Sequence, residues 1–496
     1  MTGLRRPPAA AAPAVLLVAT TLAGAVSPAT AQQHFPATPD LELMLRYMVE
    51  DGEAPGVALG VVQPDGTTRV AVYGVGPDRE AVTPETPFPI GQVTMTFTAT
   101  LLADMVARGE VSLDDRVAGY MPDGVTVPSL SGYEMTLEHL ATHRSGLPAE
   151  PPALHEDFTV EDLYRLLGTY ELDWVPGRSR EISTVGYGLL GHALARAAGR
   201  PFQELLRDRV LGPLGMDRTD FDPGIGPALR GGTGLRSSAA DMAAFVAANA
   251  GAPGSALENA LRSTHEVRTS YDPEGEGYGF SWRTTARRGE PNRVSHGGRT
   301  PESSALVTFM PATGIGAVLL ASSPEFNDWA ARALLYYASP VPPTVDVDPG
   351  TLRRYVGAYG SPAGRYRASP NSGSLYIRLE GDHLTYQPHG RIRTPLFPLS
   401  DSSFYMLRAP LTVVFDEVDG VLEMTVVADD REPNAAGRTW RSWRVDTATP
   451  RPQVAAGNAA PWTAWSTGTW LLVGLAGLAS LVLILRPLWP RRATRP

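Results

Sequence analysis

The 496-residue chain contains no cysteine, and all 43 of its basic residues are arginine. The absence of cysteine excludes disulfide bonds, thiolate catalysis, cysteine-ligated metal sites and a lipid anchor on cysteine. The absence of lysine excludes any mechanism that needs a lysine amine as general base or Schiff-base former. Arginine cannot replace it, because the guanidinium pKa is above about 12 and the group stays protonated.

Clustered positive charge is also scarce. The formal net charge is −9, and the dense group of basic residues lies at the extreme C-terminus, so nucleic-acid binding has little support. The composition, with 43% hydrophobic and 19% charged residues, is typical of globular proteins. The length is sufficient for more than one domain with its own hydrophobic core.

The N-terminus has the pattern of a secretory signal peptide over residues 1–31. Arg5 and Arg6 precede an apolar run at 14–26, and the small residues Ala29–Ala31 form a cleavage site. An uncleaved anchor is the alternative, but the small-residue ending favours cleavage. We therefore expect the mature chain to be exported.

The C-terminus predicts a single membrane span at residues 462–485. No charged residue occurs between Val454 and Leu485, and a helix of this length crosses the roughly 30 Å apolar core of a bilayer. Tryptophans lie at one end of the span and the arginine-rich tail 486–496 follows the other. Because basic tails stay cytoplasmic, the globular parts are expected on the extracytoplasmic or periplasmic side of the plasma (inner) membrane.

Residues 32–338 predict one α/β (or α+β) domain. Strand-like runs at 56–62 and 68–75 surround a Pro-Asp-Gly turn, and two more runs at 304–310 and 314–322 close the domain. Helical periodicity occurs at 41–49, 92–108, 159–169, 185–198, 202–211 and 239–249. We expect a single sheet in which the first and last strands are adjacent, with helices packed on it.

A second domain is predicted at 351–446, between a proline-rich linker at 339–350 and another linker at 447–461. Short strand-like segments alternate there with polar turns at 374–379, 384–387, 404–407, 411–415 and 421–427. Regular short strands of this kind indicate a small antiparallel barrel or sandwich.

A buried helix is predicted from residue 92 to a stop at Gly109. Its apolar residues leave no clearly polar face: Val93, Met95, Phe97, Leu101, Leu102, Met105 and Val106. A helix that is hydrophobic nearly all round belongs in the centre of a large domain. The start of such a helix, with its unpaired N–H groups, suits an anion or a developing oxyanion.

Several motifs follow one another in order across roughly residues 40–325. After Gly91 and the buried helix come Thr136–Pro148, Ile182–Tyr187, Gly231–Asp241 and His296–Gly298. Together they resemble the serine β-lactamase and penicillin-binding-protein family in its class C-type branch. The resemblance implies a β-lactamase/transpeptidase-like fold. The run Arg354–Tyr359 also resembles the lipocalin-like barrel often appended to this family.

The resemblance implies that the usual catalytic side chains are missing. The family reads Gly-Ser-x-x-Lys after Gly91, so Gln92 stands in place of the nucleophile and Met95 in place of the lysine. Ile182 takes the place of the family's tyrosine and Thr184 that of its asparagine. The Gln92 amide is no useful nucleophile, and neither the thioether of Met95 nor the alkyl chain of Ile182 can take its proton.

The backbone frame of such a site is retained. In the family two N–H groups hold the oxyanion, and they correspond here to those of Gln92 and Arg299. The residues predicted to bind a ligand are Gln92, Ser183, Thr184, His296, Gly297, Gly298 and Arg299. We predict that no catalytic group is intact, and that no metal or cofactor is bound.

Two other residues are candidates to replace the missing nucleophile. Thr96 and Ser183 carry hydroxyls, with His296 as the base either would need, but ordinary hydrogen bonding is the favoured interpretation.

His139 and His143 are four residues apart, a spacing compatible with metal binding, but no third ligand is placed beside them. Structural roles are therefore favoured for both histidines.

The sequence thus predicts an exported, membrane-anchored pseudoenzyme that binds a peptide or other cell-envelope ligand in a degenerate cleft. One alternative is an active serine hydrolase (esterase, D-aminopeptidase or DD-peptidase type) that uses non-standard groups. Another is an envelope scaffold or assembly protein that acts through its barrel and its membrane helix.

Overall fold

The computed structural model describes residues 35–151, 158–269, 275–286, 291–324, 344–360, 375–388, 391–406, 411–418, 420–428 and 439–444. The predicted signal peptide 1–31, the linker 447–461 and the predicted membrane helix 462–485 lie outside these residues. Within the described segments, no helix combines the length and the apolar character needed to cross a bilayer.

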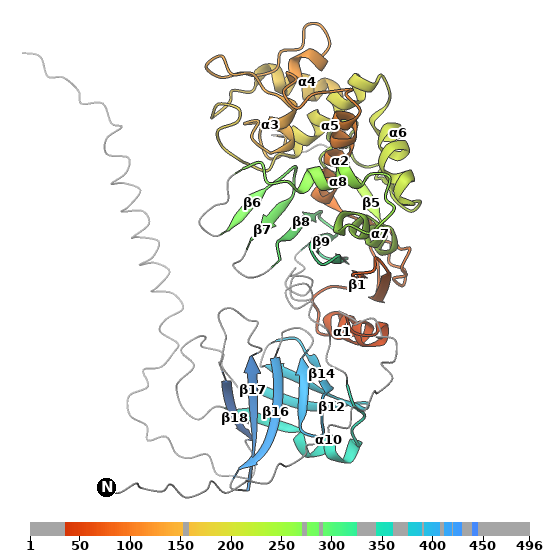
Figure 1. Ribbon diagram of the computed structural model, residues 1–496, viewed down its shortest axis with the longest axis vertical. Helices are drawn as coiled ribbons and strands as arrows, with labels where there is room; N and C mark the ends of the chain where they lie inside the picture. The colour runs from red at the N-terminus through yellow and green to blue at the C-terminus, as the bar shows by residue number, and fades with distance from the viewer. Residues whose placement is uncertain are drawn as a thin grey trace, which may run out of the picture. The chain divides into compact units, whose positions relative to one another are not determined.

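The helical elements follow one another through the first two-thirds of the chain, with one more before the barrel (Figure 1). The α-helices of the described residues, with the short 3₁₀-helix η1 that directly precedes α2, are α1 (Thr38–Glu50), η1 (Gly91–Val93), α2 (Thr94–Ala107), α3 (Leu137–Ala141), α4 (Val160–Thr169), α5 (Thr184–Ala198), α6 (Phe202–Leu206), α7 (Ala239–Ala250), α8 (Glu258–His265) and α10 (Pro349–Tyr355). The predicted helix at 202–211 divides, because the backbone continues from α6 as a π-helical turn at Arg207–Leu211.

Seven antiparallel strands form the central sheet, in the order β2-β1-β10-β9-β8-β7-β6. They are β1 (Gly56–Val62), β2 (Thr68–Gly74), β6 (Glu276–Tyr278), β7 (Arg283–Thr285), β8 (Arg293–Arg299), β9 (Ser304–Met310) and β10 (Ile315–Ala321). β1 pairs with β10, and Val57 lies opposite Ala321. The prediction that the first and last strands of the domain are neighbours is confirmed. A separate small sheet has the order β3-β5-β4, from Phe88–Pro89, Leu235–Ser237 and Asp220–Phe221.

Both faces of the sheet are covered by helices, which is why β1 is buried along its whole length. Val57, Leu59 and Val61 belong to the hydrophobic cluster that contains the apolar side chains of α1. Ala58 and Val62 belong to the larger cluster built by α2, α5 and α7. The alternation follows from the two-residue period of a strand, which directs successive side chains to opposite faces.

α2 lies in the interior of the domain, as its sequence predicts. Residues 94–105 are all buried, and Phe97 stacks on Phe245 of α7 with the ring centroids 4.1 Å apart. The buried hydroxyls of this helix have partners; Thr98 Oγ1, for example, donates to the Gly231 carbonyl oxygen at 2.7 Å. A polar group at this depth is tolerated because its hydrogen bond replaces the one it made to water.

The second domain is a closed antiparallel barrel of strands β11–β18. The strands are β11 (Gly357–Gly360), β12 (Leu375–Glu380), β13 (His383–Pro388), β14 (Thr394–Pro398), β15 (Ser403–Met406), β16 (Leu411–Val418), β17 (Val421–Ala428) and β18 (Thr439–Arg444). β11 pairs with β18 and so closes the ring. Aromatic side chains fill the core: Tyr355 of α10 stacks on Phe415 at 4.4 Å, and Phe404 packs edge-on against both.

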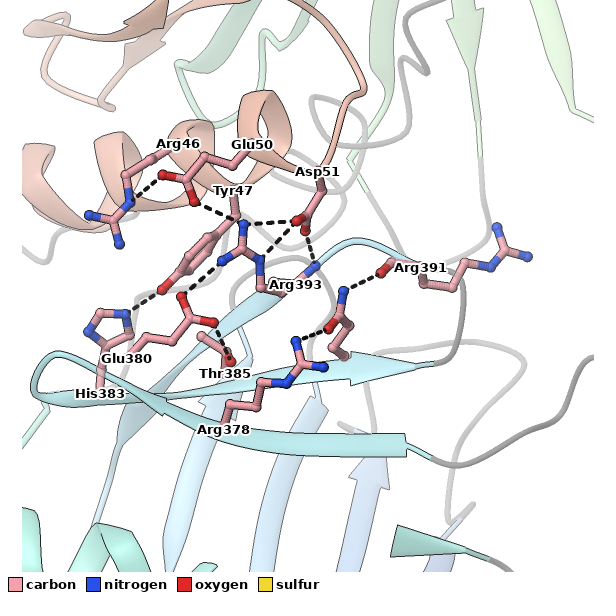
Figure 2. Close-up of polar contacts among 11 residues, drawn as sticks. Arg46, Tyr47, Glu50, Asp51, Arg378, Glu380, His383, Thr385, Arg391 and Arg393 are labelled. Atoms are coloured by element: carbon pink, nitrogen blue, oxygen red, sulfur yellow. Dashed lines mark hydrogen bonds and ion pairs between the residues drawn. The ribbon is translucent and has the colours of Figure 1, made fainter. Parts of the chain in front are cut away.

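α1 connects the two domains through a polar cluster around Arg393 (Figure 2). The Arg393 guanidinium contacts Glu50 and Asp51 at the end of α1 and Glu380 of the barrel, at 2.8–3.0 Å. Beside it, Tyr47 Oη lies 2.8 Å from His383 Nε2. Burial, followed by the negative charge of Glu380, raises the pKa of Tyr47 to about 12. The phenol is therefore neutral at physiological pH.

Candidate functional site

The candidate site lies where the end of β8 meets η1, and two glycines permit the contact. A side chain at Gly298 would place its Cβ 2.1 Å from the Ile90 carbonyl oxygen and 2.8 Å from the Gln92 nitrogen. Gly91 has a φ of 53°, and its Cβ would lie 2.6 Å from the Arg299 carbonyl oxygen. Only glycine adopts the left-handed region and this close approach without strain.

The Gln92 side chain bridges the two elements. The Arg299 backbone N–H donates a hydrogen bond of 2.9 Å to Gln92 Oε1. These are the positions at which the resemblance places two backbone donors for an oxyanion. One of the two donors is therefore already bound by the side chain that stands in place of the nucleophile.

A cavity of about 450 Å³ opens at this junction. Among the residues that line it are the predicted positions Gln92, Ile182, Thr184, His296, Gly297, Gly298 and Arg299. The cavity volume lies within the range of small-molecule sites. The structure thus brings together residues from three separate parts of the sequence that the motifs had selected.

Two predicted positions do not reach the cavity. Met95 is completely buried in the main hydrophobic cluster, so it is a core residue. Ser183, predicted to bind ligand, is 1% exposed and caps α5: its Oγ accepts from the Gly186 N–H at 2.8 Å and donates to the Pro148 carbonyl oxygen at 2.6 Å. These two bonds occupy the hydroxyl, and Ser183 is not among the residues that line the cavity.

Ser183→Ala should therefore affect stability and leave the cleft chemistry unchanged. Removing a serine cap costs about 1–2 kcal/mol of unfolding free energy, and the buried Gly186 N–H would lose its side-chain acceptor. Chemical unfolding of the variant beside the wild type measures the loss. An unchanged unfolding midpoint would contradict the capping role.

The replacement nucleophiles considered from the sequence are also occupied elsewhere. Thr96 is fully buried, and its Oγ1 donates to the Val93 carbonyl oxygen at 2.7 Å within the helix. His143, whose spacing from His139 is compatible with metal binding, is buried beside Ser281 Oγ and accepts from the Ser183 N–H. His139 accepts from the Thr136 N–H in the cap of α3. The side chains of His139 and His143 thus have structural partners.

His296 presents a neutral imidazole to the cleft. Its Nδ1 lies 2.6 Å from the Ser281 carbonyl oxygen, an acceptor, so Nδ1 carries the proton. Burial lowers the pKa of His296 to about 4, although hydrogen bonds with the backbone of Ser281 and of Gln92 act in the opposite direction. Nε2 is buried and has no partner among the described residues. The ring therefore offers a hydrogen-bond acceptor at neutral pH, and it is a weak base.

Glu150 is the cleft residue that sequence reasoning missed. It lines the cavity and accepts a hydrogen bond of 2.8 Å from Thr184 Oγ1 at its Oε1. Burial raises the pKa of Glu150 above its ordinary 4.5, while hydrogen bonds from Thr184 and Gln92 work in the opposite direction. The one available signal was position, because Glu150 follows directly on the recognised run Thr136–Pro148.

The raised pKa of Glu150 predicts a pH-dependent stability. The native state holds the carboxyl proton more tightly than the unfolded state, so this contribution is fully present below about pH 4.5 and is lost as the pH rises through the raised pKa. Glu150→Gln cannot titrate. The unfolding free energy of the wild type relative to Glu150→Gln should therefore fall with rising pH across that window, as measured by urea unfolding between about pH 4 and pH 8. A difference that rises with pH would contradict the assignment.

Comparison with known proteins identifies the fold and the family. The family model described as Beta-lactamase matches residues 41–339. D-alanyl-D-alanine-carboxypeptidase/endopeptidase AmpH of Escherichia coli (strain K12) is 35% identical over 179 residues, which are 34% of this chain and 46% of that protein. The chain thus spans about half the length of this curated relative.

Solved structures agree on the fold. D-alanine carboxypeptidase AmpC from Burkholderia cenocepacia matches with a TM-score of 0.51 and 26% identity over 60% of this chain and 97% of that one. The octameric penicillin-binding protein homologue from Pyrococcus abyssi has a TM-score of 0.51 and 21% identity, over 82% of this chain and 99% of that one. The family model covers more than half of the chain, and the site lies within the matched residues. The chain therefore belongs to the beta-lactamase family.

Proposed function

We propose that this chain is a non-catalytic member of its family that binds a peptide or other cell-envelope ligand in the cleft between η1 and β8. The observation that carries the proposal is the 2.9 Å hydrogen bond from the Arg299 N–H to Gln92 Oε1. A carboxamide here is no nucleophile, and it occupies a donor that an acyl intermediate would need.

The surrounding chemistry supports the same proposal. Met95 is buried and apolar, Ile182 has no proton to exchange, and the chain holds no lysine. A neighbouring residue could compensate for the loss of one catalytic group. The joint loss of the nucleophile, the amine and the tyrosine instead supports a protein that no longer carries out the family's reaction. The named relative AmpH is a carboxypeptidase and endopeptidase of D-alanyl-D-alanine, which supports peptide-like ligands.

The predicted terminal segments support a place for this protein at the cell membrane. A signal peptide at 1–31 and a membrane helix at 462–485 would hold both folded domains outside the cytoplasm, where cell-wall peptides occur. A fractionation experiment on the full chain tests it: recovery in the membrane fraction with the domains open to external protease supports the location, and recovery in the cytoplasm contradicts it.

Turnover assays test the non-catalytic proposal. Full-length protein incubated with nitrocefin and with p-nitrophenyl esters should hydrolyse neither above the rate of the buffer. A family member with an intact Ser-x-x-Lys site serves as the positive control. Hydrolysis that is abolished by a cleft substitution, such as His296→Ala, would contradict the proposal.

A hydrolase remains the second candidate, because the cleft contains one hydroxyl–carboxylate pair. Thr184 Oγ1 donates to Glu150 Oε1, and burial raises the pKa of that carboxyl, as is common for general bases. In this reaction Thr184 Oγ would attack the ester carbonyl carbon while Glu150 takes the hydroxyl proton. Glu150 would then protonate the leaving alcohol, and water would hydrolyse the acyl-threonine ester.

The second candidate has its own discriminating variant. Thr184→Val keeps the shape of the side chain and removes the hydroxyl, so any ester hydrolysis that depends on this pair would be lost. Hydrolysis that persists in Thr184→Val but disappears in Glu150→Gln would instead indicate direct activation of water by the carboxylate.

A further inference from the structure

The Gln92 carboxamide has a hydrogen-bonding partner at each of its two ends. Its oxygen accepts from the Arg299 backbone N–H at 2.9 Å. Gln92 and Glu150 line the same cavity, and a hydrogen bond from the Gln92 side chain acts to lower the pKa of the Glu150 carboxyl. Glu150 is held in turn by Thr184 Oγ1 at 2.8 Å. A donor at one end and a carboxylate at the other match the carbonyl and the N–H₂ of one planar amide.

We propose that this pair forms a carboxamide-binding site which Gln92 occupies in the free protein and which a ligand amide takes over by displacing it. The inference rests on the proposed function and specifies its ligand class: a neutral amide, such as a peptide bond or a carboxamide side chain. The Gln92 side chain competes with the ligand for this site. The ligand can bind only those molecules in which the side chain has left the site, so the apparent affinity is lower in proportion to their fraction.

The charges of the cleft select an amide over the obvious alternatives. A carboxylate ligand bound to the Arg299 N–H would place its second oxygen against the Glu150 carboxylate, and like charges at this distance repel. An ester or ketone satisfies the Arg299 N–H but cannot replace the donor that Gln92 supplies to Glu150, which keeps its hydrogen bond from Thr184. A partly buried carboxylate oxygen that loses a donor is left with less hydrogen bonding, so of two ligands of equal size the one that supplies an N–H should bind more tightly.

A second acceptor on the cavity wall suits the same ligand class. His296 Nε2 is buried without a partner among the described residues and belongs to a residue that lines the cavity. Because Nδ1 carries the ring proton, Nε2 can accept a hydrogen bond from a ligand N–H. A peptide, with several amide N–H groups, provides donors for both Glu150 and His296.

Cavity complementation tests the proposal directly. Gln92→Gly removes the equivalent of one propanamide molecule, so added propanamide should refill the vacated site. At about 100 mM, propanamide should raise the melting temperature of Gln92→Gly by about 2 °C more than it raises that of the wild type. Butanone, which replaces the N–H₂ by a methyl group, and propanoate should produce no such difference between the two proteins.

Two further variants test whether the preference for an amide comes from this site. In Gln92→Ala, which is the safer variant if Gln92→Gly fails to fold, acetamide is the matching fragment and should show the same preference. Adding Glu150→Leu should abolish the preference for propanamide over butanone. Equal shifts with butanone or with propanoate, or no difference between variant and wild type with any amide, would overturn the carboxamide site. A covalent adduct or turnover would overturn the non-catalytic proposal and leave this outcome unaffected.

Discussion

Gly298→Ala is expected to destabilise the protein by about 3 kcal/mol, whereas Gly297→Ala, one residue earlier in the same strand, is expected to change stability little. A Cβ at 298 would lie 2.1 Å from the Ile90 carbonyl oxygen and 2.8 Å from both the Gln92 and Val93 nitrogens. These are backbone atoms, which cannot rotate away as a side chain can. Relief requires β8 and η1 to separate, an overpacking cost of this order.

Gly297 is the matched control. It is exposed on the same strand, and a Cβ there would find its nearest neighbour, the Ala305 carbonyl oxygen, 3.7 Å away. That distance is ordinary van der Waals contact. Urea unfolding of both variants measures the difference, and the Gly298 variant should also lose the Gln92–Arg299 contact. Equal stability of the two variants would show that β8 does not approach η1 as described.

Arg393→Ala is expected to lower the unfolding free energy by about 2 kcal/mol, the second largest effect. The arginine side chain is 16% exposed and contacts three carboxylates, those of Glu50, Asp51 and Glu380 (Figure 2). Its removal leaves these negative charges facing one another with no cation among them. Losing one partner of a fully buried pair costs about 3–5 kcal/mol, and the partial exposure of Glu50 and Glu380 reduces that value.

Arg378→Ala is the control for this variant, because Arg378 is exposed and its Nη1 donates to Gln387 Oε1 within the barrel. Surface substitutions of this kind usually change stability by less than about 0.5 kcal/mol. If the Arg393 cluster attaches the barrel to α1, limited proteolysis should release the barrel faster from Arg393→Ala than from Arg378→Ala. Equal rates and equal stabilities would contradict the role of this cluster.

Sequence patterns predicted those parts of the fold that depend on local chemistry or on hydrophobic periodicity. The bounds of β1 and β9 coincide with the predicted strands, and the apolar run after Gln92 is the buried helix α2. The pairing of β1 with β10 was predicted from the position of their strand-like runs at the two ends of the domain. The strong apolar runs left few other arrangements that bury them.

The missed features depend on long-range contacts. β14 was not predicted, because its sequence Thr-Pro-Leu-Phe-Pro has proline at both ends of a short apolar core and proline disfavours strand interiors. Ser183 was assigned to the cleft from its motif, but the position of the Pro148 carbonyl oxygen decides where its hydroxyl points. Glu150 belongs to the cleft because burial beside Gln92 and Thr184 places it there, and no pattern in the sequence shows that burial.

The most direct test of the central claim is the intact mass of the full-length protein after incubation with a fluorophosphonate and, separately, with a penicillin. With Gln92 in place of the nucleophile and its side chain on the Arg299 N–H, we expect an unchanged mass while the protein remains folded. A family member with an intact Ser-x-x-Lys motif, treated in parallel, should be labelled stoichiometrically. A stoichiometric adduct on this chain would contradict the account, and an adduct mapped to Thr184 would establish the hydrolase instead.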